Sequence, residues 1–354
     1  MLQCAGQVRT MWKMNSPPGQ SNWSRRARAP RRRAIKQGTG TMKVCVAGAS
    51  GAFGVKHLDA IKNIPGVEVT SIVGGRSGDL EGFAKERGIK HWTRDLNESL
   101  ARSDVDAVIL STPTQMHVEQ GLACMKAGKH VLIEIPMADS LAGAEALVRT
   151  QKETGVVGMA GHVRRFNPSH QYIHNKIKKG ELKIQQMDVQ TYFFRRTNTN
   201  ATGQARSWTD HLLWHHACHT VDLFQYQTGE EPSKVMGLEG PHHPNLGIAM
   251  DMSIGLKTPS GAICTLSLSF NNDGPLGTFF RYICDNGTYL ARYDDLYDGK
   301  DNKIDLSGVA VSNNGIELID REFFAAIKDG REPNSSLAQC LPAMRTLDRI
   351  EKQF

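Results

Sequence analysis

Residues 42–54 read M-K-V-C-V-A-G-A-S-G-A-F-G and join an apolar run to a glycine-rich turn. The run over 43–48 predicts a buried strand, and the stretch over 52–63 predicts a helix that ends before Pro65. Glycines permit a tight turn, and the N–H groups of the helix N-terminus then favour a pyrophosphate. The cofactor-binding residues predicted for this turn are Gly48, Ser50, Gly51, Ala52, Phe53 and Gly54.

The glycines of this turn follow G-x-x-G-x-x-G rather than the usual dinucleotide spacing G-x-G-x-x-G. A simple strand-to-helix turn is therefore the alternative interpretation. The strand before the turn and the helix after it favour dinucleotide binding.

The second predicted strand, 67–73, bears on the choice between NAD and NADP. An Asp or Glu at its tip would bind the ribose 2′-hydroxyl of NAD, but here Gly74, Gly75, Arg76 and Ser77 follow Val73. A guanidinium and a hydroxyl can hold a 2′-phosphate, so Arg76 and Ser77 are predicted cofactor ligands. The sequence favours NADP, with NAD as the alternative, and Arg76 as a solvated loop residue is the competing interpretation.

Short apolar runs alternate with helical stretches through the first half of the chain, which predicts an α/β fold with an N-terminal parallel Rossmann sheet covered by helices. The predicted strands are 43–48, 67–73, 105–111, 130–135 and 156–160. The predicted helices are 52–63, 77–87, 115–127 and 140–154.

After about Phe166 the pattern changes to longer alternating strands joined by turns. It predicts a second α+β domain built on an open-faced, largely antiparallel sheet. Its predicted strands are 185–195, 250–256, 262–270, 279–284 and 289–293, and its predicted helices are 170–179, 319–328 and 337–354. We expect a dinucleotide-binding domain over 42–162 and a substrate-binding and dimerisation domain over 163–354, whose C-terminal helices pack back on the first domain.

The N-terminal residues 1–41 hold nine Lys and Arg side chains and no acid, whereas the whole chain has a formal net charge of +7. The basic charge thus belongs to this segment, which we expect to be a disordered extension. The rest of the chain gives no reason to expect a nucleic-acid partner. No apolar run is long enough to span a membrane. The seven cysteines show no metal-binding spacing, which indicates no metal and a cytoplasmic protein with free thiols.

Several strings occur together in the order seen in one family. They are Ser111-Thr112-Pro113 with His117, Gly128-Lys129-His130 leading to Glu134-Ile135-Pro136, Gly161-His162 with Arg165-Phe166-Asn167-Pro168, and His219 with Asp222-Leu223. From Met42 onward the chain resembles the glucose–fructose oxidoreductase / inositol dehydrogenase family. Long strings such as R-S-W-T-D-H-L-L-W-H-H-A narrow the resemblance to a family member that oxidises a carboxylated semialdehyde. The resemblance implies an NADP- or NAD-linked dehydrogenase that acts as a homodimer on a small carboxylated molecule.

Two positions depart from the family pattern. Ile135 stands where the family usually has a catalytic lysine, and His215 stands where it often has an aspartate. Only the late histidine, His219, matches directly, and the resemblance implies that it is the base or proton relay. A histidine suits this role because its ordinary pKa lies close to working pH.

His211, His215 and His219 lie four residues apart, so a helix would place all three on one face. His215 is the second predicted catalytic residue. Structural packing and metal binding are the alternative interpretations of these histidines, and no carboxylate or cysteine pattern supports a metal.

Other predicted site residues lie where strands end or near the domain boundary. Thr112, Pro113 and His117 follow a strand, and Glu134 ends the next one, so all four are predicted to bind the cofactor. Arginine binds carboxylates through paired hydrogen bonds. The predicted substrate-binding residues are His162, Arg164, Arg165 and Trp208.

The preferred hypothesis is oxidation of a cyclic hemiacetal to a lactone. A sugar or inositol dehydrogenase is the first alternative, and the arginine-rich second half argues for an anionic substrate instead. A non-catalytic dinucleotide-sensing regulator is the second alternative, suggested by the missing lysine at Ile135.

Overall fold

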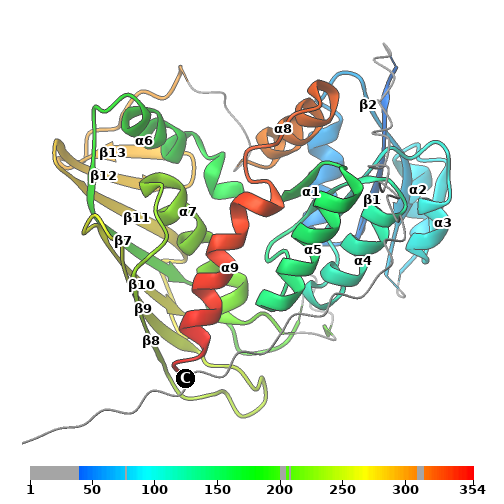
Figure 1. Ribbon diagram of the computed structural model, residues 1–354. Coiled ribbons are helices and arrows are strands. Elements are labelled where there is room, and N and C mark those ends of the chain that lie inside the picture. The colour runs from blue at the N-terminus through cyan, green and yellow to red at the C-terminus, as the bar shows by residue number, and fades with distance from the viewer. Residues whose placement is uncertain (1–39, 76–77, 200–204, 207–208, 309–314) are drawn as a thin grey trace, which may run out of the picture. The chain divides into compact units, whose positions relative to one another are not determined.

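The computed structural model describes residues 40–75, 78–199, 205–206, 209–308 and 315–354. Two sheets, each packed against helices, make up this part of the chain (Figure 1). Nearly all of the predicted basic extension lies outside the described residues. Among the described helices, none is both long and apolar enough to cross a membrane.

The first sheet has six parallel strands in the order β3-β2-β1-β4-β5-β6. These are β1 (Met42–Ala47), β2 (Val67–Val73), β3 (His91–Thr93), β4 (Ala107–Leu110), β5 (His130–Ile133) and β6 (Gly158–Ala160). The chain order reverses between β1 and β4, and open sheets of this kind bind ligands beyond the carboxyl ends of the strands at such a point. The predicted Rossmann sheet is therefore confirmed.

The strands of this sheet are apolar because both of their faces are buried. Along β1, Val44 and Val46 belong to one core while Cys45 and Ala47 belong to the other. The covering helices are α1 (Ala52–Ile61), α2 (Leu80–Glu86), α3 (Leu96–Leu100), α4 (Thr114–Lys126) and α5 (Leu141–Thr154).

The second sheet has seven strands in the order β13-β12-β11-β7-β10-β9-β8. These are β7 (Ile184–Tyr192), β8 (Lys234–Glu239), β9 (Asp251–Lys257), β10 (Ile263–Ser269), β11 (Gly277–Cys284), β12 (Gly287–Arg292) and β13 (Asp295–Asp298). Every pairing is antiparallel except that of β7 with β10, which is parallel. The predicted second domain on an open-faced, largely antiparallel sheet is confirmed.

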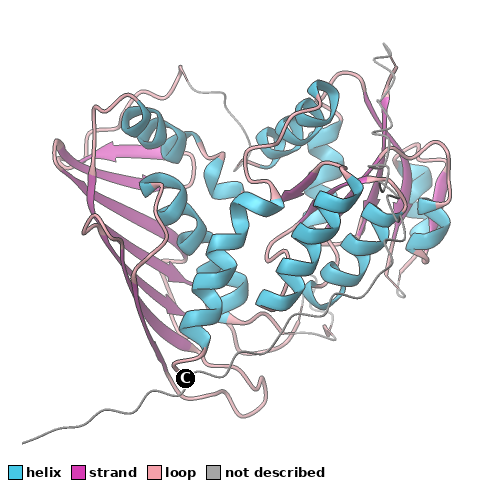
Figure 2. Ribbon diagram, viewed as in Figure 1, coloured by secondary structure: helices cyan, strands magenta, loops and turns pink. Residues whose placement is uncertain are grey.

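In the part of the chain that the structure describes, helices cover one face of the second sheet and leave the other open, as Figure 2 shows. On this face lie the 3₁₀ helix η1 (Val163–Arg165), α6 (Pro168–Lys178), the π-helix η2 (Leu212–Ala217) and α7 (Cys218–Thr228). Alternate residues of β7 are buried toward these helices, whereas Asp188, Gln190 and Tyr192 are less buried. This alternation is the half-buried pattern from which the strand was predicted.

The last two helices return to the first sheet. Helix α8 (Ile316–Asp329) contacts α1, and its Phe323 shares a core with Val44 and Val46. Helix α9 (Leu337–Glu351) contacts both α5 and α7. Residues distant in sequence from the glycine turn therefore help to build its surroundings.

Candidate active site

The glycine turn after β1 leaves no room for side chains at two positions. Gly48 has a φ of +78° and donates its N–H to the carbonyl of Val73 at 2.8 Å. A Cβ on Gly48 would lie 2.4 Å from the Ser111 carbonyl oxygen, and a Cβ on Gly54 would lie 2.2 Å from the Gly48 carbonyl oxygen. The glycines therefore let α1 start close against β1 and β4.

The N-terminus of α1 is open toward this turn. Gly51 is its N-cap and provides no side-chain hydrogen bond, and the first turn of the helix holds no acidic residue. Ser50, Ala52 and Phe53 are exposed. Uncapped N–H groups without a competing carboxylate are a suitable binding site for a pyrophosphate, so these residues fit the predicted cofactor.

A cation that we did not predict lies beside the loop after β2. Arg94 follows β3 and donates hydrogen bonds to the carbonyls of Gly75 and Gly78, the latter at 3.0 Å. The predicted ligands Arg76 and Ser77 lie between these glycines, outside the described residues. The sequence did not indicate Arg94 as a site residue, because the strand before it, β3, has only three residues and was not predicted.

The loops after β4 and β5 are linked by His117. Its Nδ1 lies 2.8 Å from the carbonyl oxygen of Pro136, and its Nε2 lies 2.8 Å from that of Thr112. Thr112 also donates its hydroxyl to Gln120 at 2.6 Å, and Pro113 is the N-cap of α4. Both ring nitrogens of His117 contact the protein, so its role here is to hold the two loops together. Its direct contact with the cofactor stays a prediction.

The predicted alignment of three histidines on one helix face is wrong. His211 precedes the helix with extended backbone, φ −93° and ψ 134°, and its Nδ1 accepts from the N–H of Leu213. The helical segment then begins as the π-helix η2, and α7 follows it directly. A π-turn needs an additional residue and often occurs at functional sites. The histidines that act electrostatically on His219 are His215 and His216 from this turn, with His162 from beyond β6.

His219 and His162 face each other edge to face, with ring centroids 6.4 Å apart. Among the described residues, no group forms a hydrogen bond with Nδ1 of His219 or with either nitrogen of His162. Burial, with the charge of Arg164 and the neighbouring histidines, holds the pKa of His219 well below its ordinary 6.5. A neutral imidazole of this kind can accept a proton at neutral pH.

A carboxylate that we did not predict lies beside His215. Oδ1 of Asp210 is 3.8 Å from Nε2 of His215, and the other carboxylate oxygen accepts from Arg195 and, at 3.3 Å, from Arg206. In the family resemblance, His215 itself stands where an aspartate is often found. In the folded chain, Asp210 supplies a carboxylate from five positions earlier.

The two predicted substrate arginines, Arg164 and Arg165, differ in their surroundings. Arg165 forms a bidentate ion pair with Asp222, through Nε at 2.8 Å and Nη2 at 2.6 Å, and is 4% exposed. A contact between Arg165 and a substrate carboxylate would require this pair to open. Arg164 lies over the ring of Tyr293, 4.9 Å from its centroid, and acts on His219. Trp208 lies outside the described residues.

The buried ion pair between Arg165 and Asp222 is expected to stabilise the fold strongly. Replacing Asp222 by Asn leaves the Arg165 charge buried without its partner, which should lower the free energy of unfolding by about 3–5 kcal/mol. Urea unfolding followed by circular dichroism would measure the loss. The control is Glu231→Gln, which breaks an exposed ion pair with Arg345. That change should cost less than about 1 kcal/mol. Equal losses in the two variants would contradict the prediction.

Among the described residues, two groups of side chains have metal-binding geometry, and in both an arginine already contacts the carboxylate. The groups are His162-Asp222-Cys340 and Asp210-His215-His216. Arg165 forms an ion pair with Asp222, and Arg195 and Arg206 form ion pairs with Asp210. A guanidinium on each carboxylate competes with a metal ion, so neither group is assigned one.

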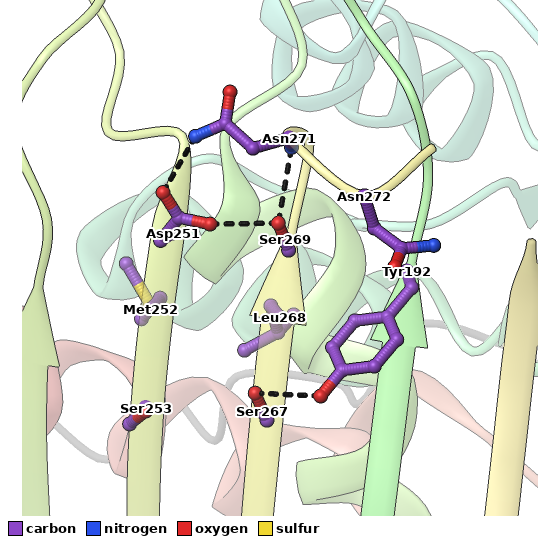
Figure 3. A pocket seen from close by; sticks show the side chains of 9 residues that line it. All are labelled: Tyr192, Asp251, Met252, Ser253, Ser267, Leu268, Ser269, Asn271 and Asn272. Atoms are coloured by element: carbon purple, nitrogen blue, oxygen red, sulfur yellow. Dashed lines mark hydrogen bonds between the residues drawn. The ribbon is translucent and has the colours of Figure 1, made fainter. Parts of the chain in front are cut away.

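A cavity of about 380 Å³ lies on the second sheet, away from these histidines (Figure 3). Asp251 accepts from the hydroxyl of Ser269 and from the side-chain amide of Asn271, each at 2.6 Å, and Tyr192 donates to Ser267 at 3.1 Å. The cavity contains none of the predicted site residues. It lies on β7, β9 and β10, within the domain where we expect dimerisation. The homodimer and the cytoplasmic location both stay predictions.

A Rossmann sheet with an uncapped first helix, together with a neutral histidine beside its carboxyl edge, defines the class of a dinucleotide-binding oxidoreductase. Residues 42–162 match the model of an oxidoreductase family with an NAD-binding Rossmann fold, and residues 168–310 match the C-terminal model of bacterial oxidoreductases. The chain belongs to this family of NAD(P)-binding oxidoreductases, so the predicted resemblance is confirmed.

Individual relatives agree with this assignment. The chain is 66% identical over 313 residues to 4-carboxy-2-hydroxymuconate-6-semialdehyde dehydrogenase of a Sphingobium species. The aligned residues cover 88% of this chain and 99% of that one. It is 29% identical over 257 residues to inositol 2-dehydrogenase of Mycolicibacterium smegmatis, 72% of each chain. The fold matches an aldose–aldose oxidoreductase of Caulobacter crescentus with a TM-score of 0.77 at 19% identity, over 88% of this chain and 97% of that one.

Proposed function

We propose that this chain oxidises the cyclic hemiacetal of 4-carboxy-2-hydroxymuconate-6-semialdehyde to 2-pyrone-4,6-dicarboxylate, a step of the protocatechuate 4,5-cleavage pathway. The observation that carries the proposal is 66% identity over 99% of a dehydrogenase named for that substrate. The cluster of His162, His215, His216 and His219, called the histidine cluster below, supports it. These histidines are neutral and lie at the carboxyl edge of the Rossmann sheet, where the reaction needs a base.

Oxidation of the hemiacetal removes a hydride from its carbon and a proton from its hydroxyl. An oxidised dinucleotide, when bound, would supply the hydride acceptor. His219 takes the hydroxyl proton, because burial and Arg164 keep its imidazole neutral. As the hydride and the proton leave, the bond between this carbon and its hydroxyl oxygen becomes the lactone carbonyl. His162 and His215 lie near enough to His219 to act on its charge, and they are its candidate proton-relay partners.

The carboxylates of the substrate require cations near His219. Arg164 is the first candidate because its charge already acts on that histidine. Arg195 and Arg206 are the second, since they converge on Asp210 beside His215 and their side chains are each 15% exposed. Guanidinium groups bind carboxylates through paired hydrogen bonds, which favours this dicarboxylate over a neutral sugar.

We propose NADP rather than NAD as the cofactor. No acid follows Val73 in the loop 74–78. Arg94 donates to the carbonyls of Gly75 and Gly78 in this loop, which supports a cationic site for a 2′-phosphate there.

The reaction can be tested directly with the ring-cleavage product of protocatechuate. We expect the absorbance of the reduced dinucleotide to rise with NADP, and more slowly at equal concentration with NAD. Turnover of inositol or a hexose in place of this substrate would contradict the proposal and favour a sugar dehydrogenase. Dinucleotide binding without turnover of any of these substrates would favour the sensing regulator.

A further inference from the structure

A buried ion triad joins three elements that are distant in the sequence. His57 lies on α1, Glu134 directly follows β5, and Asp320 lies on α8. Nδ1 of His57 is 2.8 Å and 3.0 Å from the two carboxylate oxygens of Asp320, and its Nε2 is 3.0 Å from Oε1 of Glu134. The side chains of His57 and Asp320 are fully buried, and that of Glu134 is 10% exposed.

The imidazole of His57 must be protonated to satisfy both neighbours. A neutral imidazole donates from only one nitrogen, whereas two carboxylates can only accept. The two carboxylates raise the pKa of His57 to about 10, against the opposing effect of burial. Beyond the triad, Glu317 acts on Asp320 from one turn away on α8, and the titratable groups that face Glu134 include His117, His162 and His215. His57 is therefore a fixed cation under the carboxyl edge of the sheet.

Glu134 connects this cation to the dinucleotide site. It begins the segment Glu134-Ile135-Pro136, whose last carbonyl oxygen is bound by His117. A Cβ on Gly161 would lie 3.0 Å from Oε2 of Glu134, so a glycine there leaves space for the carboxylate. Glu134 also acts electrostatically on His162 and His215. Its carboxylate thus contacts the buried imidazolium through Oε1, while Oε2 accepts from the N–H of Ile135 at 3.2 Å.

We propose that His57 and Asp320 are positioning residues of the dinucleotide site, which hold the Glu134 carboxylate in one orientation to accept a hydrogen bond from a ribose hydroxyl at the nicotinamide end. Asp320 holds the imidazole of His57 in place through Nδ1, and Nε2 of His57 holds the carboxylate of Glu134. Helix α8, which follows the whole second sheet in the chain, therefore takes part in cofactor affinity. This inference rests on the proposed function only in that the chain binds a nicotinamide dinucleotide.

The first test observes the charge of His57 in the intact protein. In ¹⁵N-histidine NMR spectra at pH 8.5 we expect one imidazolium, assigned to His57 by its loss in His57→Gln. The described histidines with a lowered pKa, such as His219, should be neutral at that pH. A neutral His57 at pH 8.5 would overturn the inference, whatever the activity of the enzyme.

The second test measures dinucleotide affinity by isothermal titration with NADP. We expect Asp320→Asn to weaken binding by about tenfold at pH 8, since one charge-assisted hydrogen bond at Glu134 is lost. Glu134→Gln should weaken binding by a similar factor, and the double variant should be no weaker than Glu134→Gln alone. The control, Glu322→Gln, neutralises another carboxylate of α8, one that pairs with Arg331 at 2.7 Å, and it should leave affinity unchanged.

The outcomes separate this inference from the proposed function. Additive losses in the double variant, or unchanged affinity in Asp320→Asn or Glu134→Gln, would overturn the positioning role while the wild-type enzyme still oxidised its substrate. Wild-type protein that binds NADP but oxidises nothing would contradict the proposed reaction and leave the positioning role intact.

Discussion

Replacing His219 by alanine is expected to lower kcat by about 10²- to 10⁴-fold, the usual contribution of a positioned general base. The dissociation constant of NADP should change by less than about twofold, because the proposed dinucleotide-binding residues lie on the glycine turn and the loops after β2 and β5. Stopped-flow oxidation of the semialdehyde and isothermal titration with NADP would measure the two quantities. A loss of affinity as large as the loss of turnover would contradict the role of His219 as base.

The matched control for His219→Ala is His242→Ala. The side chain of His242 is 55% exposed and pairs with Glu239, and neither residue belongs to the histidine cluster. Its replacement removes an imidazole of equal size without touching that cluster. We expect wild-type kcat in this control.

The pH dependence of the same reaction follows from the lowered pKa of His219. Only the neutral imidazole can accept the hydroxyl proton, and the pKa of this group lies well below 6.5. The acid limb of kcat/KM should therefore lie below pH 6.5, and the rate should stay constant between there and neutral pH. An acid limb with a midpoint above pH 6.5 would contradict the assignment, because an unperturbed or cationic histidine would then be responsible.

The first sheet could be predicted because its determinants are local. A buried strand followed by Gly48, Gly51 and Gly54 defines the turn within a few residues. By contrast, β3 and β13 have only three and four residues, and β8 is mostly exposed, so neither length nor periodicity marked them. The predicted helix over 77–87 begins only at Leu80, because Asp79 caps it through the N–H of Gly82.

The histidine cluster was predicted in part. His219 was assigned from the resemblance and His215 from the four-residue spacing, but the π-turn that brings His216 beside them cannot be predicted from that spacing. Asp320 had no local signal, since an acid on an amphipathic helix is ordinarily solvated. Its pairing with His57 spans 263 positions and arises only because α8 packs on α1.

Replacing Gly54 by alanine is expected to weaken NADP binding by about a hundredfold or more, since small displacements at a binding site have effects of this size. The added Cβ would lie 2.2 Å from the Gly48 carbonyl oxygen and 2.7 Å from Cα of Ala49, and neither backbone atom can rotate away. Helix α1 would have to move from the turn, which would shift the N–H groups that we propose bind the pyrophosphate.

Gly51→Ala is the graded control for Gly54→Ala, because it adds the same methyl group to the same turn. A Cβ on Gly51 would meet only the Gly48 carbonyl oxygen, at 3.1 Å, and its φ of −77° suits alanine. We expect a loss of affinity below about fivefold in this variant, since a contact of this length needs only a small backbone adjustment. Isothermal titration with NADP would measure both variants, and circular dichroism would check that each is folded. Equal losses in two folded variants would show that close approach of α1 to β1 is not what the glycine turn provides.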